Sequence, residues 1–341
     1  MRVSTVGGQE IADRDVQLLE RLATARREIE SEIAKQVVGQ RPLVEGLLTA
    51  LFGGGHALLV GVPGLAKTLV VSSLARALHL KFSRIQFTPD LMPSDITGSE
   101  IMEENPATGR RAFRFVQGPI FAHVILADEV NRTPPKTQAA LLQAMQEGEV
   151  TAGGETHALE RPFFVLATQN PIEQEGTYPL PEAQLDRFML ELRVGYPSRQ
   201  EEEEVAARTT TDALETIRPV LEASEILELQ HLVRRVPVAP SVIAGAVRLC
   251  RATRPEDPES PDYVQRWVRW GAGPRATQHW VLAAKARAAL DGRATPNHDD
   301  VRAAALPVLR HRVLTNFQAE AEGETAESVV RRLVEESRSW T

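Results

Sequence analysis

The sequence predicts an α/β domain with a mainly parallel sheet, followed by a smaller helical domain. Short apolar runs alternate with longer helical stretches in the first part of the chain, and the strand-like runs stop after Gly195. Strands that are separated by helices need crossover connections, so the sheet should be mainly parallel and covered by helices on both faces. The predicted strands are Ala57–Val60, Phe82–Phe87, Val124–Ala127, Phe163–Ala167 and Phe188–Val194.

Two helices are predicted before the first strand. In the segment Asp13–Ala34 apolar residues recur on one helical face among charged neighbours, which is typical of an amphipathic helix packed on a core. That apolar face contains Val16, Leu19, Leu22, Ile29 and Ile33. A shorter helix is predicted over Pro42–Phe52, and the glycines Gly53–Gly55 end it.

Two segments within the α/β part predict inserted β-hairpins. Ile101–Val116 has a turn signal at Asn105–Gly109, and Glu149–Leu159 has one at Gly153-Gly154. Such hairpins either line a substrate path or lie on the surface without touching substrate, and the sequence favours neither role.

The last part of the chain carries only helical patterns, and it opens with the acidic run Glu201–Glu204. Acidic side chains at a helix start are favoured by the helix dipole. Further helices are predicted over Ala223–Arg234, Ser241–Thr253, Thr277–Leu290, His298–His311 and Glu324–Ser339. We therefore expect an N-terminal helical segment at residues 1–36, an α/β core at 37–200 and an all-helical domain at 201–341.

Composition and charge indicate an ordinary globular protein. The chain has 341 residues, of which 43% are hydrophobic and 25% charged, and its formal net charge is −7. This acidic balance creates no global attraction to nucleic acid or acidic lipid. Cys250 is the only cysteine, so it has no intrachain disulfide partner, and we expect a small buried thiol. No apolar run approaches the length of about 18 residues that a membrane helix needs, so we expect a cytoplasmic enzyme without membrane insertion.

The strongest chemical signal directly follows the apolar run His56–Val60. A strand that passes through a glycine-containing turn into a helix points backbone N–H groups at a phosphate. Lys67 would reach the β and γ phosphates of ATP, and the Thr68 hydroxyl would hold Mg²⁺. The usual motif has glycine where this chain has Ala66, so an ordinary turn with a chance lysine is the alternative. The residues expected to bind the nucleotide here are Gly61, Val62, Pro63, Gly64, Leu65, Ala66, Lys67, Thr68 and Leu69.

Two adjacent carboxylates end the predicted strand Val124–Ala127. Asp128 is placed to organise Mg²⁺, and Glu129 to orient and deprotonate the attacking water. Paired acids after a strand also serve as helix caps. The pair therefore indicates a catalytic site only in combination with the phosphate-binding segment before it. Asn170 follows the strand Phe163–Ala167 and is placed to hydrogen-bond the γ-phosphate or the water, with an Asn-Pro turn as its alternative role.

Five blocks of the chain resemble the MoxR family of AAA+ ATPases in order and spacing, from about Val37 to about Thr315. The blocks are Gly61–Thr68, Ala127–Glu147, Ala167–Pro171, Leu180–Phe188 and Gly271–Ala276. The second block reads ADEVNRTPPKTQAALLQAMQE and is far more specific than the phosphate loop. The resemblance also accounts for Ala66, which looks like this family's version of the loop.

The resemblance implies a P-loop AAA+ domain with inserted hairpins, followed by a helical lid. Lys67 and Thr68 then look like the phosphate-loop pair. Asp128 and Glu129 look like the metal-organising and catalytic acids, and Asn170 resembles the first sensor.

The resemblance also assigns roles to positions away from the phosphate loop and the two acids. Val38, Gly39 and Gln40 match the segment that lies over the adenine. Arg187 resembles an arginine finger that reaches into a neighbouring subunit's nucleotide, with an intrachain salt bridge to Glu182 or Asp186 as the alternative. Arg275 resembles the second sensor, with an exposed helix-start arginine as the alternative. Arg132 is assigned no role.

The resemblance further implies a ring, expected to be a hexamer, that hydrolyses ATP with Mg²⁺ and remodels a protein client with a von Willebrand A-domain partner. A nucleic-acid motor or a chelatase-like subunit is the alternative. The hairpin region Glu149–Glu160 has no lysine or arginine, but the other hairpin carries Arg110, Arg111 and Arg114. A scaffold that binds ATP without hydrolysis is a third reading, which the retained Glu129 argues against.

Overall fold

A five-stranded parallel sheet forms the centre of the computed structural model, which describes residues 5–6, 9–10, 13–104, 111–172, 176–210 and 215–339. The strands of this sheet are β3 (Ala57–Val60), β4 (Phe82–Gln86), β7 (Val124–Asp128), β10 (Phe164–Gln169) and β11 (Leu190–Arg193). Their order across the sheet is β11-β3-β10-β7-β4, and every neighbouring pair is parallel. The predicted sheet and its five strands are confirmed, with small shifts at the strand ends.

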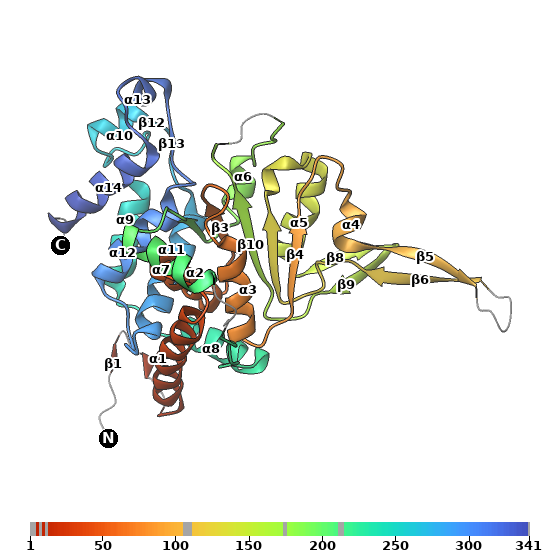
Figure 1. The fold of residues 1–341 in the computed structure, drawn as a ribbon. Helices are drawn as coiled ribbons and strands as arrows, with labels where there is room; N and C mark the ends of the chain where they lie inside the picture. The colour runs from red at the N-terminus through yellow and green to blue at the C-terminus, as the bar shows by residue number, and fades with distance from the viewer. Residues whose placement is uncertain are drawn as a thin grey trace.

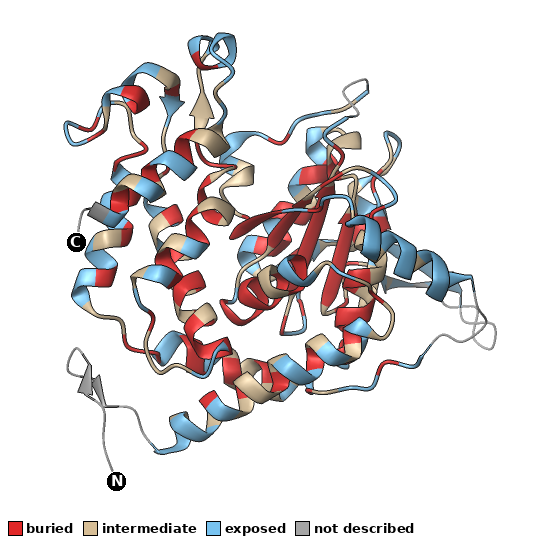
Figure 2. Cartoon of the chain, turned by 60° about the vertical axis from the view of Figure 1, so that its left-hand side comes forward, coloured by how far each residue is buried: buried red, intermediate tan, exposed pale blue. Residues whose placement is uncertain are grey.

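Helices cover both faces of this sheet, as Figure 1 shows. The helices of the α/β part are α1 (Asp13–Ala34), α2 (Arg41–Phe52), α3 (Lys67–Ala77), α4 (Pro93–Thr97), α5 (Pro135–Glu147) and α6 (Glu182–Leu185), with a 3₁₀ turn at Val130–Arg132. Alternate residues of a strand point to opposite faces. Leu59 accordingly packs in the cluster with α1, α2 and α3, whereas its neighbour Leu58 packs in the cluster with α5. Figure 2 shows the sheet mostly in the colour of buried residues, and β3, β7, β10 and β11 are each buried over most of their length.

The parallel arrangement brings the carboxyl ends of the strands to one edge. Gln169 of β10 lies beside Val60 of β3, and Gln86 of β4 lies beside Asp128 of β7. Loops that follow these ends therefore meet above the same edge, which is where ligands bind in open parallel sheets.

Both predicted hairpins are confirmed. The first consists of β5 (Gly98–Glu104) and β6 (Arg111–Gln117), and Figure 1 shows it projecting from the body; its predicted turn at Asn105–Gly109 lies outside the described residues, as does Arg110. The second consists of β8 (Glu149–Ala152) and β9 (Glu155–Ala158). Its turn glycines have φ values of 61° and 80°, the left-handed region that a two-residue hairpin turn requires. The ring of Phe115 stacks on His157 at 4.0 Å between ring centroids, so the bases of the two hairpins support each other.

The C-terminal part is helical, as predicted. Its helices are α7 (Arg199–Thr209), α8 (Ala223–Arg235), α9 (Pro240–Arg251), α10 (Asp262–Trp267), α11 (Pro274–Leu290), α12 (His298–Leu309), α13 (Phe317–Ala321) and α14 (Ala326–Glu336), with a 3₁₀ turn at Ser337–Ser339. The predicted acidic helix start is confirmed, because Ser198 and Glu201 form a capping box at the first turn of α7. Cys250 is fully buried, also as predicted.

One detail of the all-helical prediction is wrong. Strands β12 (Val268–Trp270) and β13 (Leu314–Thr315) form a short antiparallel pair within the helical part. Strands this short show no alternating pattern in a sequence, so periodicity could not reveal them. A further short pair, β1 (Thr5–Val6) with β2 (Gln9–Glu10), precedes α1.

The apolar face of α1 packs as predicted, apart from Val16. Leu22 and Ile29 are fully buried, whereas Val16 is 45% exposed because it lies in the first turn of the helix, where little of the fold covers it. Helix α1 and the C-terminal helices share one apolar cluster, in which Trp280 of α11 is fully buried. The domain boundaries at residues 36 and 200 stay predictions. None of the helices in the described part of the chain combines the length and apolarity that a membrane crossing requires.

Candidate functional site

A cavity of about 440 Å³ lies above the carboxyl ends of β3, β7 and β10. Its volume is in the range of small-molecule sites. It brings together the predicted phosphate loop, both predicted acids and Asn170, together with two residues that the sequence analysis did not single out, Arg84 and Thr168. The lining residues are Pro63, Gly64, Leu65, Ala66, Lys67, Thr68, Leu69, Arg84, Asp128, Glu129, Thr168 and Asn170.

The loop between β3 and α3 leaves the start of the helix open to a ligand. Ala66 occupies the N-cap position of α3 with φ 57°, and its side chain makes no capping hydrogen bond. The first N–H groups of a helix have no partner within the helix, so here they are available to an anion. Gly61 keeps the loop close to the edge strand, because a Cβ at this position would come within 2.6 Å of the carbonyl oxygen of Val194.

Lys67 is folded back onto its own loop. Its Nζ donates hydrogen bonds to the backbone carbonyls of Gly61 and of Val62, the latter at 3.2 Å. Burial lowers the pKa of Lys67, and the nearby carboxylates of Asp128 and Glu129 act in the opposite direction. The ammonium group is thus held inside the cavity, where phosphate oxygens would be stronger acceptors than these carbonyls.

The Thr168 hydroxyl connects the two acids. It donates to Asp128 Oδ1 at 2.6 Å and accepts the backbone N–H of Glu129 at 2.8 Å. Thr168 is 1% exposed, so this bridge is firmly placed by the sheet. The only sequence signal for it is a polar residue near the end of an otherwise apolar strand.

Glu129 projects from an unusual backbone position. Its φ of 57° lies in the left-handed region, which non-glycine residues rarely adopt outside special sites. Gln86 Nε2 donates to Glu129 Oε2 at 2.9 Å, and Arg132 Nη1 lies 3.2 Å from the same oxygen. Arg132, which had no assigned role, therefore lies beside the predicted catalytic acid, and Gln86 was missed because it lies on a different strand.

Asn170 forms the turn that was its alternative role, and its predicted contact with phosphate or water stays a prediction. Its Oδ1 accepts the backbone N–H of Ile172 at 3.2 Å, which is the turn that an Asn-Pro dipeptide favours. The side chain is 6% exposed and lines the cavity beside Glu129. The turn thus fixes the amide in a position from which it can reach a ligand.

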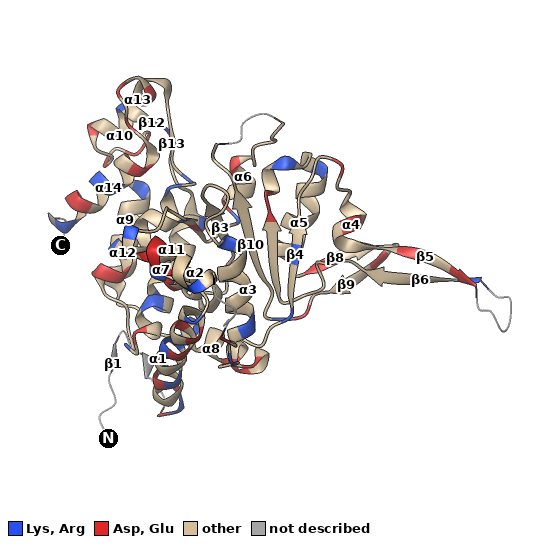
Figure 3. Cartoon of the chain, viewed as in Figure 1, with Lys and Arg blue, Asp and Glu red and all other residues tan. Residues whose placement is uncertain are grey.

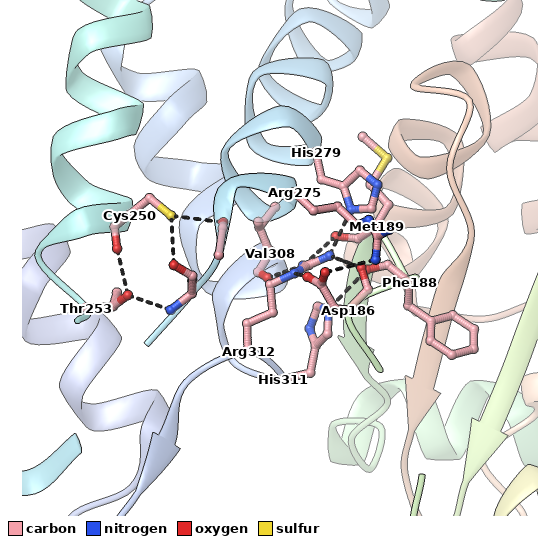
Figure 4. Close-up of polar contacts among 12 residues, drawn as sticks. Asp186, Phe188, Met189, Cys250, Thr253, Arg275, His279, Val308, His311 and Arg312 are labelled. Atoms are coloured by element: carbon pink, nitrogen blue, oxygen red, sulfur yellow. Dashed lines mark hydrogen bonds and ion pairs between the residues drawn. The ribbon is translucent and has the colours of Figure 1, made fainter. Parts of the chain in front are cut away.

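Arg187 and Arg275 do not line this cavity. Arg187 Nη1 donates to the carbonyl of Leu142 on α5 at 2.8 Å. Asp186, the carboxylate considered as its salt-bridge partner, instead pairs with Arg275 at 3.1 Å and with Arg312 at 2.7 Å, as Figure 4 shows. Within the described residues Arg187 has no ion pair with Glu182 or Asp186, so the salt-bridge alternative for Arg187 is wrong.

The segment Val38–Gln40 also lies outside the cavity lining, although it is close to the same edge of the sheet. Gln40 Nε2 donates to the carbonyl of Gly195 at 3.4 Å, just beyond β11. Gly39 has φ 66°, and a Cβ there would come within 2.3 Å of Glu201 Oε1. The predicted contact of this segment with adenine stays a prediction.

The oxygen groups of the cavity suit Mg²⁺, which protein and phosphate oxygens can bind together. They do not suit a metal ion that protein side chains would have to hold alone. The described residues contain no group of three or more His, Cys, Asp or Glu side chains that could hold a metal ion. Mg²⁺ is typically bound by one or two protein oxygens plus phosphate and water oxygens. Thr68 and Asp128, which line one cavity with the phosphate loop, provide a donor set of that kind.

Comparisons with known proteins agree with this geometry. The family model described as "ATPase family associated with various cellular activities (AAA)" matches residues 56–190, and an AAA lid domain matches residues 263–333. Chaperone MoxR1 of Mycobacterium tuberculosis is 42% identical to this chain over 329 residues, which cover 96% of this chain and 84% of the relative. Protein MoxR of Paracoccus denitrificans is 32% identical over 305 residues, covering 84% of this chain and 88% of the relative.

A solved structure shows the same fold. The crystal structure of a protein from Cytophaga hutchinsonii, described as a "putative ATPase", superposes with a TM-score of 0.86 at 39% identity. The match covers 94% of this chain and 96% of the other. The α/β core and the helical C-terminal part therefore occur together in a related protein.

Proposed function

The chain belongs to the MoxR family of AAA+ ATPases, and from this premise we propose that it hydrolyses ATP to ADP and phosphate in a Mg²⁺-dependent reaction. The observation that carries the proposal is the Thr168 hydroxyl, which holds Asp128 and Glu129 side by side in the cavity that the phosphate loop lines. A metal-organising acid and a base next to a phosphate cradle are the parts that phosphoryl transfer to water requires.

Five residues of the cavity have a proposed task in this reaction. Lys67 and the open N–H groups of α3 bind the phosphates, and Asn170 positions the attacking water. Mg²⁺, held by Thr68, Asp128 and phosphate oxygens, would neutralise charge on the phosphates. Glu129 accepts a proton from the water while the water oxygen forms a bond to the γ-phosphorus. The bond between that phosphorus and the β–γ bridging oxygen breaks, and ADP leaves.

We propose further that the active form is a ring, expected to be a hexamer. Arg187 lies away from the chain's own cavity, where its guanidinium donates to the carbonyl of Leu142. We propose that Arg187 completes the nucleotide site of a neighbouring subunit, whereas Arg275 stays the proposed second sensor. A cation supplied in this way stabilises the developing phosphate charge and can raise the rate by about 10³–10⁵.

The proposed task of the ring is to remodel a protein client, together with a von Willebrand A-domain partner. The projecting hairpin supports the proposal of a polypeptide substrate. Its Met102 and Phe113 face each other across the two strands and are 57% and 72% exposed. Exposed apolar side chains of this size suit contact with another polypeptide. Figure 3 shows acidic and basic residues interspersed along the chain, and the formal net charge is −7, which favours a protein partner over nucleic acid.

The chemistry is tested by two variants that separate binding from hydrolysis. Lys67→Ala should abolish binding of a fluorescent ATP analogue, because the loop loses its positive side chain. Glu129→Gln should bind the analogue normally but hydrolyse ATP at least about a hundredfold more slowly, because the base is removed. Exposed Lys81→Ala and Glu155→Gln serve as matched controls and should behave like the wild type. Wild-type affinity in Lys67→Ala would place the nucleotide elsewhere.

The partner is tested with the same Glu129→Gln variant. Loaded with ATP, it should remain in the bound state and retain its partners during affinity capture. Recovery of a protein with a von Willebrand A domain would support the proposal. Recovery of DNA in its place would favour the nucleic-acid motor.

A further inference from the structure

Arg84 contributes a positive charge to the cavity from the edge strand β4. Residues alternate between the two faces of a strand, so Arg84 and Gln86 lie on one face while Ile85 is buried on the other. Arg84 Nη2 and Nε lie 2.5 Å and 3.1 Å from Asp128 Oδ2, and Nη2 also donates to Gln86 Oε1 at 2.7 Å. The guanidinium therefore contacts the same carboxylate that is proposed to organise Mg²⁺.

The two oxygens of Asp128 have different partners. Oδ1 accepts the Thr168 hydroxyl, which comes from the buried core of the sheet, whereas Oδ2 accepts Arg84, which lines the cavity. Asp128 is itself mostly buried, with 13% of its side chain exposed. An unpaired carboxylate at this depth would be unfavourable, and it would also repel an incoming phosphate.

We propose that Arg84 is a built-in substitute for Mg²⁺, which neutralises Asp128 in the metal-free protein and leaves Oδ2 when the metal arrives. The inference rests on the proposed function, because it assigns the metal to Asp128. A guanidinium and a divalent cation at one carboxylate oxygen repel each other, so the two compete for it. Arg84 can be displaced readily because its side chain is 47% exposed, and ion pairs with an exposed partner contribute little to stability.

The exchange gives the site an order of events. Before the metal binds, Arg84 removes the repulsion between Asp128 and the phosphates, so ATP can enter a cavity that also contains Glu129. After the metal binds, the guanidinium remains beside Gln86 and no longer competes for Oδ2. Two opposite effects should follow from removing Arg84, namely tighter metal binding to the free protein and weaker binding of ATP without metal.

The first effect is measured by electron paramagnetic resonance of Mn²⁺ added to nucleotide-free protein. Arg84→Ala should bind Mn²⁺ at least about tenfold more tightly than the wild type, because the competing charge is gone. Arg84→Lys should lie between the two, since it keeps the charge but not the two-pronged contact. The matched control is Arg76→Ala, which removes the same charge from an exposed position on α3 whose hydrogen bonds go to Ser72. It should leave the Mn²⁺ affinity unchanged.

A double variant shows where the metal binds. Arg84→Ala with Asp128→Asn should lose the gain in Mn²⁺ affinity, because the freed carboxylate is no longer there. Binding of a fluorescent ATP analogue in excess EDTA should be weaker in Arg84→Ala than in the wild type by at least about tenfold. Equal Mn²⁺ affinity in Arg84→Ala and the wild type, with normal ATP binding by the wild type, would overturn this inference alone. Failure of the wild type to bind ATP would overturn the proposed function and this inference with it.

Discussion

Arg312 Nε lies 2.7 Å from Asp186 Oδ1, and this contact joins the C-terminal helices to the residue before Arg187. Arg312 lies three residues beyond the end of α12, is 6% exposed, and also donates to the backbone carbonyls of Asp186 and Phe188. Its Nη2 lies 2.8 Å from His279 Nδ1. The other oxygen of Asp186 pairs with Arg275, which is 45% exposed (Figure 4). One carboxylate thus has a buried partner and a partner near solvent.

The two arginines should therefore differ in their effect on stability. Arg312→Met removes the buried partner of Asp186 and the donor to several buried carbonyls, which should lower the free energy of unfolding by about 3–5 kcal/mol. Arg275→Met removes a half-exposed ion pair and should lower it by no more than about 1 kcal/mol. Urea denaturation of the two variants measures both values. Equal losses would mean that Arg312 does not anchor this segment.

The left-handed conformation of Ala66 predicts that a change from alanine to glycine has opposite effects on stability at Ala66 and at Ala139. Glycine adopts φ 57° without the steric conflict of a Cβ, so Ala66→Gly should raise the free energy of unfolding by up to about 1 kcal/mol. Ala139 is exposed in the regular helix α5, where the same change should lower it by about 1 kcal/mol. Thermal or urea unfolding of both variants tests the pair. A loss in Ala66→Gly as large as in Ala139→Gly would contradict the strained geometry.

The His56 ring predicts a loss of stability in acid. Its Nε2 lies 3.2 Å from the carbonyl of Met145, and its Nδ1 accepts the backbone N–H of Val165 at 3.1 Å, so the ring is neutral with the proton on Nε2. Burial lowers the pKa of His56 to about 4 from its ordinary 6.5. The unfolded chain therefore binds the proton first, and the stability that the neutral ring contributes is lost as the pH falls from 6.5 towards 4.

The midpoint of thermal unfolding, measured across this pH range, tests the prediction. His56→Gln keeps a donor and an acceptor but does not titrate, so its midpoint should fall less steeply between pH 6.5 and 4 than that of the wild type. His279 adds a loss in the same direction, because burial and then the Arg312 charge lower its pKa to about 3. Parallel curves for His56→Gln and the wild type would assign the acid sensitivity to other groups.

The sheet and most helices were predictable because their signals are periodic and local. A buried strand such as β7 contains a continuous apolar run, Val124–Ala127, and α1 shows its packed face in its own sequence. The pair β12–β13 was not predictable, because each strand has only two or three residues. The two strands also lie more than 40 positions apart in the chain, since Val268 pairs with Thr315.

The candidate site divides in the same way. The phosphate loop and the two acids are contiguous in sequence, so their chemistry could be recognised before the fold was known. Arg84, Gln86 and Thr168 are single polar residues within strands, and their partners are set by which strand lies beside which. Asp186 shows the same limit, since its partner Arg312 lies 126 positions further along the chain.

The last prediction separates a ring from an ATPase that works as a single subunit. Arg187 is outside the chain's own cavity, so Arg187→Ala should bind ATP nearly normally but hydrolyse it poorly. Mixing this variant with Lys67→Ala should restore part of the activity, because one subunit supplies the intact cavity and its neighbour supplies the arginine. Each variant alone lacks one half of every site. Arg193→Ala mixed with Lys67→Ala serves as a control, since Arg193 pairs with Glu327 in its own chain at 2.9 Å.

The same arrangement makes activity depend on assembly. The specific activity of the wild type should rise with protein concentration through the range in which ultracentrifugation shows monomers giving way to oligomers, because only assembled subunits have a complete site. A flat specific activity over that range, together with no recovery in the Arg187→Ala and Lys67→Ala mixture, would contradict a shared site. Arg187 would then be a structural residue whose guanidinium fixes the end of α6 to the Leu142 carbonyl of α5.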